Sequence, residues 1–281
     1  MTRGAGDRLF QAATYLVAGL VAAVLLWILA DMAWQGVGHL SWEFLTAAPE
    51  KSGRAGGIAP ILVSTALILV VALLAAVPIG LGAAIWLAEY SKQSGRAAAS
   101  IRLSLDVLAG VPSIVFGLFG NAFFCVFLGL GFSILSGGLT LACMILPIFI
   151  RTCERGLFAV NNDWRFAAAG LGMTRASAIW HVLLPAAAPA IVAGLMLGIG
   201  RATAETAALI FTSGYVDRMP ESLSDSGRAL AVHIFDLSMN IAGGDKAAYA
   251  SALVLVVLIV LIDVTAVALS DRWLTRRIVT A

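Results

Sequence analysis

Long apolar stretches alternate with shorter polar segments along the chain, and six of these stretches are long enough to cross a membrane as helices. A helix needs about twenty apolar residues to span a bilayer. The pattern predicts spans at about residues 10–31, 59–88, 112–131, 133–151, 189–211 and 248–270. We therefore expect an all-α membrane protein whose 281 residues form one transmembrane domain.

Local features refine these elements. The first apolar stretch is longer than the roughly 7–15 residues typical of a cleaved signal peptide, so we expect it to be retained as a span. In the second span, Pro78-Ile-Gly-Leu-Gly82 predicts a kink or a break. Gly110-Val-Pro-Ser113 is a helix-entry signal before the third span. The polar segment 212–247 contains an amphipathic stretch around residues 230–239, which predicts a helix at the interface or folded back into the protein.

The composition agrees with this pattern. Of the residues, 60% are hydrophobic and 12% are charged, whereas soluble domains carry about 25% charged residues. A net charge of +2 without a basic and aromatic cluster argues against a nucleic-acid partner. The cysteines and histidines have the spacing of neither a disulfide framework nor a metal site; they are Cys125, Cys143, Cys153, His39, His181 and His233.

Basic residues near the span ends predict the orientation, since cytoplasmic segments carry an excess of lysine and arginine. With the N-terminus inside, the inner segments hold Arg3, Arg8, Lys92, Arg96, Arg102, Arg151, Arg155, Arg165, Arg175, Arg272, Arg276 and Arg277. The outer segments hold Lys51, Arg54, Arg218, Arg228 and Lys246. We therefore expect both termini and the loop 152–188 to be cytoplasmic, and residues 212–247 to lie outside.

The polar loop between the fourth and fifth spans has the signals of two short helices. Asn162 or Asp163 is expected to cap a helix that runs to about Leu171, and Gly172 to end it in a left-handed conformation. Thr174 is expected to cap a second helix that runs to Pro185. We call residues 161–185 the elbow.

The elbow resembles the cytoplasmic coupling loop of bacterial ABC importer permeases. That family has the pattern Glu-Ala-Ala, three residues, Gly, nine residues, an aliphatic residue, any residue and Leu-Pro. The residues that fall on the pattern are Ala167, Ala168, Gly172, Val182, Leu184 and Pro185. The resemblance implies that this short rigid helix pair sits in a groove of an ATPase and transmits its motion to the spans on either side.

One position departs from the family pattern. Phe166 stands where the family has a glutamate that is expected to contact a basic residue of the ATPase. In this chain, Phe166 would fill an apolar pocket of the ATPase instead, or the neighbouring Arg165 would supply a different polar contact. The resemblance therefore keeps the coupling role and puts the charge pairing in doubt.

The fifth span holds two ionisable residues, Arg201 and Glu205, in the sequence Gly-Arg-Ala-Thr-Ala-Glu-Thr-Ala. Their spacing of four places both on one face of a helix. A charge at mid-bilayer costs about 2.5–3.5 kcal/mol, so this face is expected to turn inward, to a partner or to water. A structural ion pair would satisfy this requirement. An anion path would also satisfy it, since a guanidinium binds oxyanions through a planar fork of donors and Glu205 would hold it in place.

This stretch is similar to the fifth span of phosphate-specific ABC importer permeases, as are residues 56–60, 78–90 and 106–120. The resemblance is closest to permeases of the PstA type. It implies the six-span MetI-like fold, with a coupling helix between the fourth and fifth spans. It also implies a path for phosphate that involves Arg201, Glu205 and Thr206. The implied partners are a homologous PstC-like permease, a PstB-like ATPase dimer that binds ATP and magnesium, and a periplasmic PstS-like phosphate-binding protein.

Other functions receive less support from the sequence. The chain lacks the Gly-x4-Gly-Lys-Ser/Thr phosphate loop, so energy for uphill transport must come from a partner or an ion gradient. We expect no enzymatic activity in this subunit. Another oxyanion, such as phosphonate, sulfate or molybdate, remains an alternative substrate. A stand-alone transporter or channel would leave the elbow without a purpose, and a hydrolase built on Asp31 and Asp263 has no recognisable motif.

Overall fold

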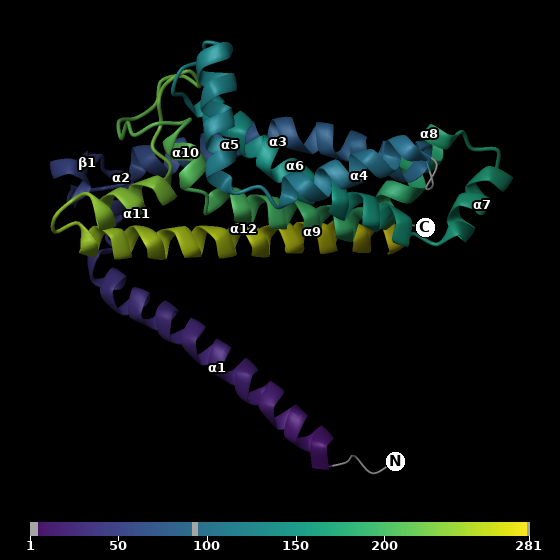
Figure 1. Ribbon diagram of the computed structural model, residues 1–281, viewed down its shortest axis with the longest axis horizontal. Coiled ribbons are helices and arrows are strands. Elements are labelled where there is room, and N and C mark those ends of the chain that lie inside the picture. The colour runs from purple at the N-terminus through teal and green to yellow at the C-terminus, as the bar shows by residue number, and fades with distance from the viewer. Residues whose placement is uncertain (1–4, 92–94, 280–281) are drawn as a thin grey trace.

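The chain is mostly helical in the computed structural model, which describes residues 5–91 and 95–279 (Figure 1). The longer α-helices are α1 Ala5–Gly36, α3 Ala59–Ile85, α4 Arg96–Ala109, α6 Ile134–Ala159, α9 Leu184–Thr203, α11 Leu230–Met239 and α12 Asp245–Val279. The shorter ones are α2 Trp42–Thr46, α5 Ser113–Gly120, α7 Asn162–Gly170, α8 Arg175–Ala178 and α10 Ala207–Ile210. Three π-helical segments, η3 Trp86–Tyr90, η4 Asn121–Phe127 and η5 Ile179–Leu183, continue α3, α5 and α8. Two 3₁₀ turns, η1 Val37–His39 and η2 Lys51–Gly53, and a small antiparallel hairpin of β1 Pro49–Glu50 and β2 Ala55–Gly56 complete the chain.

Within the described residues, five helices are long and apolar enough to span a membrane. They cover Leu9–His39, Ala59–Tyr90, Ile134–Ala159, Arg175–Thr203 and Asp245–Ala268. A sixth candidate is a bent pair, Arg96–Ala109 and Ser113–Phe127, whose two parts meet at 102°. With that pair counted as one broken span, the protein has the six spans that the sequence predicts.

The bent pair corrects the expected third span. Residues 112–131 were predicted to form it alone, after a polar segment that ends near Asp106. The structure instead places α4 in that polar segment, along α6, and turns the chain sharply before α5 (Figure 1). The turn has a local cause, because Pro112 disfavours helical backbone at the residue before it and then opens the next helix.

Helices α3, α6 and α9 form the centre of the bundle and pack closely through small residues. A Cβ at Gly80 would lie 2.5 Å from the Phe149 ring, and one at Gly198 would lie 2.6 Å from Ile145. Of the kink or break predicted near Pro78, the break does not occur, since α3 continues through this residue. Neighbouring helices that pack on a proline turn allow it to remain inside a membrane helix.

The two ends of the bundle differ. The elbow end carries α7 and α8, and the loop end carries β1, α2 and α11 (Figure 1). At the loop end, α11 buries Leu230, Val232 and Leu237 against the bundle, which confirms the prediction of a helix folded back into the protein. Helix α1 leaves the bundle at this end beside α12. Its long apolar stretch is not buried by other parts of this chain.

Candidate functional site

The elbow has the helix–turn–helix form that the sequence predicts. Gly172 adopts the expected left-handed conformation with φ +71°. The Thr174 hydroxyl accepts a hydrogen bond from the Ser177 N–H, so it caps the second helix as predicted. The first cap was assigned wrongly, because the Asn161 side chain accepts from the Asp163 N–H and α7 begins at Asn162. The second helix also continues beyond Pro185, through η5 and into α9.

The elbow has an exposed apolar surface on one part and packs into the protein through another. Phe166 is 72% exposed on α7, and Trp164, Leu171 and Trp180 are exposed around it. Ala167 and Gly172 are exposed as well, whereas Ala168 is 3% exposed. The second helix packs into a cluster of buried residues that consists of Leu157, Ile179, Leu183, Leu184 and Ala187, beside the half-buried Pro185. Exposed apolar side chains on a rigid turn are typical of a protein contact surface.

The Arg165 guanidinium makes an ion pair and hydrogen bonds within this chain. Its Nη2 lies 2.6 Å from Glu89 Oε1 and donates to the Leu157 carbonyl at 2.8 Å, and its Nη1 donates to the Val160 carbonyl at 2.8 Å. These contacts hold the elbow against η3 and the end of α6. The guanidinium is therefore engaged within the chain, whereas a polar contact of Arg165 with an ATPase was one of the two alternatives considered for the missing family glutamate.

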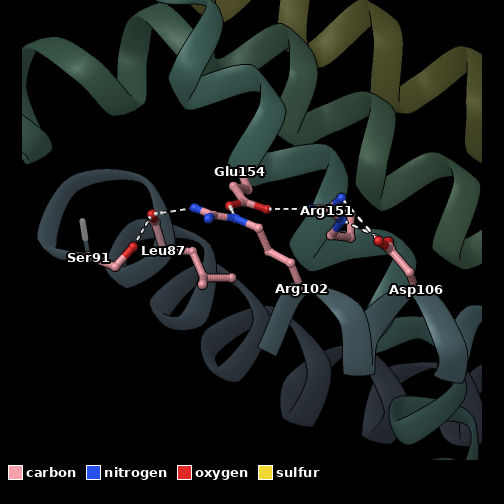
Figure 2. Close-up of polar contacts among 6 residues, drawn as sticks. All are labelled: Leu87, Ser91, Arg102, Asp106, Arg151 and Glu154. Carbon is pink, nitrogen blue, oxygen red and sulfur yellow. Dashed lines mark hydrogen bonds and ion pairs between the residues drawn. The ribbon is translucent and has the colours of Figure 1, made fainter. Parts of the chain in front are cut away.

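A buried carboxylate organises the same end of the bundle. Glu154 of α6 is 1% exposed and accepts from Arg102 Nε at 2.6 Å and from Arg151 Nη1 at 2.8 Å (Figure 2). Arg151 also pairs with Asp106 of α4 at 3.0 Å. We did not single out these residues from the sequence, although Arg151 and Glu154 at a spacing of three on a predicted span were a usable signal.

The residues of the predicted anion path are arranged differently in the structure from what the sequence predicts. Helix α9 ends at Thr203, so Arg201 and Glu205 do not share a helix face, and the expectation that they do is wrong. The Glu205 carboxylate accepts from the Ala208 N–H at 3.2 Å and thereby supports the first turn of α10. Arg201 is partly exposed, and its side chain has no hydrogen bond or ion pair within the described chain. Thr206 lies between the two helices and is partly buried.

At the loop end, Arg228 gathers a second polar cluster. Its Nη1 lies 3.3 Å from Asp236 and 3.8 Å from Asp217, and its Nε donates to the Tyr215 carbonyl. The same Nη1 lies 3.4 Å from His233 Nδ1. His233 is fully buried, and its Nε2 has no partner among the described residues. The cluster ties the loop before α11 to α11 itself.

We expect the cluster to make stability depend on pH. Burial, reinforced by Arg228, lowers the His233 pKa from 6.5 to about 4, against the opposing effect of Asp217 and Asp236. Between these two values the unfolded chain binds a proton that the folded chain does not. The unfolding free energy therefore falls as the pH falls from about 6.5 to about 4, by about 3 kcal/mol for this residue.

Thermal unfolding of the purified protein across this pH range measures the effect. His233→Gln removes the titrating ring and should flatten that part of the profile. An unchanged slope in the variant would show that His233 is protonated in the folded protein.

Comparison with known proteins identifies the family to which a chain with this geometry belongs. Residues 76–278 match the sequence model of a family described as the binding-protein-dependent transport system inner membrane component. The probable ABC transporter permease YqgI of Bacillus subtilis is 30% identical over 98% of this chain and 96% of its own length. The phosphate transport system permease PstA 2 of Mycobacterium bovis is 30% identical over 78% of this chain and 72% of its own. PstA of Xylella fastidiosa is 34% identical over 64% and 62%.

Solved structures confirm the fold. A subunit of a bacterial ABC transporter for the acidic polysaccharide alginate superposes with a TM-score of 0.62 and 16% identity, over 94% of this chain and 99% of that one. A chain of the inward-facing methionine transporter MetNI gives a TM-score of 0.55 and 15% identity, over 77% and 95%. The spans, the elbow and the family match together show that this chain belongs to the inner-membrane components of binding-protein-dependent transport systems, the permease subunits of ABC importers.

Proposed function

We propose that this chain is the PstA-type permease subunit of an ATP-driven importer of inorganic phosphate. The observation that carries the proposal is Arg201, a guanidinium in a membrane helix without a partner in the described chain. An unpaired intramembrane charge marks a substrate path by default. Two relatives at 30% and 34% identity are phosphate transport system permeases by name, which favours phosphate among the oxyanions.

In this proposal Arg201 binds the anion through its fork of donors. Glu205 serves a different purpose from the one first expected, because its carboxylate supports α10 rather than the guanidinium. As a negative charge in the same segment, it also weakens anion binding enough for release. Thr206, at the start of α10, supplies a neutral hydroxyl beside the path.

The proposed assembly has a second permease of the PstC type, a PstB-type ATPase dimer that binds ATP and magnesium, and a PstS-type binding protein outside. The exposed apolar surface of the elbow supports a protein partner at that end. The basic residues of α4, α6 and the elbow support a cytoplasmic elbow end, with both termini on the same side. Arg3 and Lys92, which entered the orientation argument, lie outside the described residues.

Uptake of radiolabelled phosphate by the reconstituted four-component complex tests this function. Phosphate uptake should require ATP and the binding protein, and excess sulfate, molybdate or phosphonate should leave it unchanged. Transport of one of these anions in preference to phosphate would replace the substrate and keep the permease role. Gradient-driven flux through this chain alone would overturn the ABC mechanism.

Phe166→Glu tests the coupling surface. The change restores the charge that the family pattern has at this position, and the exposed ring makes no packing contribution that the fold depends on. We therefore expect ATPase association to be retained or strengthened in a pull-down with the purified ATPase. The matched control is Ala168→Glu, which places the same charge at a buried neighbour and should disrupt the elbow. Loss of the complex with Phe166→Glu would count against the coupling assignment.

A further inference from the structure

The π-helical segment η3 contacts both the elbow and α4 at the elbow end, and we infer its role from these contacts. We propose that η3, anchored to the elbow by the Glu89–Arg165 ion pair, is the joint through which movement of the elbow reaches the bent pair α4–α5. This inference rests on the proposed function, since it describes how the permease would pass on the motion of its ATPase. It makes Glu89 a positioning residue.

The first step joins both helices of the elbow to η3. Arg165 of α7 lies 2.6 Å from Glu89, and both side chains are largely buried, at 23% and 10% exposure. The Arg175 guanidinium of α8 lies 5.5 Å from the centre of the Tyr90 ring, a cation–π contact. A movement of the elbow therefore acts on two neighbouring residues of η3, and one of the contacts is a short, charge-assisted one.

The second step joins η3 to α4. The Leu87 carbonyl accepts from Arg102 Nη2 at 3.2 Å and from the Ser91 hydroxyl at 2.7 Å (Figure 2). Arg102 lies on α4, and its Nε is held by the buried Glu154 of α6. Figure 2 shows the Arg102 side chain reaching between the Leu87 carbonyl and Glu154. The wide turn of a π-helix changes the intrahelical bonding of such carbonyls, and π turns often lie at functional sites.

The third step leads from α4 to the predicted anion path. Helix α4 meets α5 at 102°, and a bend between two rigid helices converts a shift of one into a rotation of the other. Helix α5 packs directly on α10, where a Cβ at Gly117 would lie 2.8 Å from Ala208 Cα. The Ala208 N–H is the group that Glu205 binds. A contiguous set of contacts thus runs from Arg165 to the segment that follows Arg201.

The test uses the assembled complex in proteoliposomes, with transported phosphate and hydrolysed ATP measured together. Glu89→Gln keeps the side-chain shape and removes the charge. We expect assembly and basal ATP hydrolysis to be unchanged, and phosphate moved per ATP to fall about five-fold or more. Glu89→Asp keeps the charge and should recover part of the ratio. Glu221→Gln, an exposed carboxylate at the loop end, is the control for loss of an acidic group.

A second readout does not depend on the substrate. Leu118 of α5 is 53% exposed, so Leu118→Cys reports the position of α5 through its rate of maleimide labelling. The proposal predicts that ATP changes this rate and that Glu89→Gln abolishes the change. If the wild-type complex moves no phosphate but shows the ATP-dependent labelling change, the proposal of phosphate import is wrong and the proposed role of η3 is supported.

Two results would overturn the joint. One is a wild-type ratio of phosphate to ATP in Glu89→Gln together with a normal labelling change. The other is failure of Glu89→Gln to assemble with the ATPase, which would make the ion pair a requirement of docking.

Discussion

Replacing Arg201 with alanine should abolish phosphate uptake while the complex still assembles. The guanidinium has no hydrogen bond or ion pair within the described chain, so its removal leaves no buried partner uncompensated. The helix itself should also tolerate the change, because alanine has the highest helix propensity. What is lost is the planar fork of donors that suits a phosphate oxyanion.

Uptake and ATPase pull-down, measured on the same preparation, check this result. Arg201→Lys keeps a positive charge without the fork and should retain part of the uptake. Arg218→Ala removes an exposed arginine at the loop end and should transport normally. Normal uptake by Arg201→Ala would remove this residue from the anion path.

Replacing Glu154 with glutamine should markedly lower the unfolding free energy of the protein. The carboxylate is 1% exposed and pairs with two arginines. A neutral amide removes the buried negative charge that Arg102 and Arg151 share, while Arg151 keeps its more exposed partner Asp106. Breaking a buried ion pair by removing one partner costs about 3–5 kcal/mol, and the partial exposure of both arginines favours the lower end of that range.

Thermal unfolding of the purified permease in detergent measures this loss. The matched control is Asp106→Asn, which removes the other carboxylate that Arg151 binds. Asp106 is 54% exposed, so this change should cost at most about 1 kcal/mol. Equal unfolding temperatures for Glu154→Gln and the wild type would show that the buried carboxylate is dispensable.

The elbow shows how far local sequence patterns reach. The left-handed Gly172 and the Thr174 cap were predicted correctly, because each depends on hydrogen bonds or backbone freedom within a few residues. The first cap is Asn161 rather than Asn162 or Asp163, and all three residues have side chains that cap helices. Only the fold shows that Arg165 faces Glu89, which lies 76 residues earlier in the chain.

At the predicted anion path, the local sequence pattern led to a wrong prediction. A spacing of four between Arg201 and Glu205 predicts one helix face only if the helix continues past both. The structure ends α9 at Thr203 and uses the Glu205 carboxylate to start α10. The apolar sequence on either side contains no strong stop signal, and α10, which follows the end of α9, packs closely on α5.

The sequence by itself determined the membrane class, the approximate positions of the spans and the helix–turn–helix form of the elbow. Apolar length and capping side chains act over one helix or one turn, so they can be read directly from the residues. The tertiary structure alone decided the end of α9 and the ion pairs of Glu154 and Glu89. These features join segments that are distant in the chain, and their energies depend on which buried charges the packed helices bring within reach.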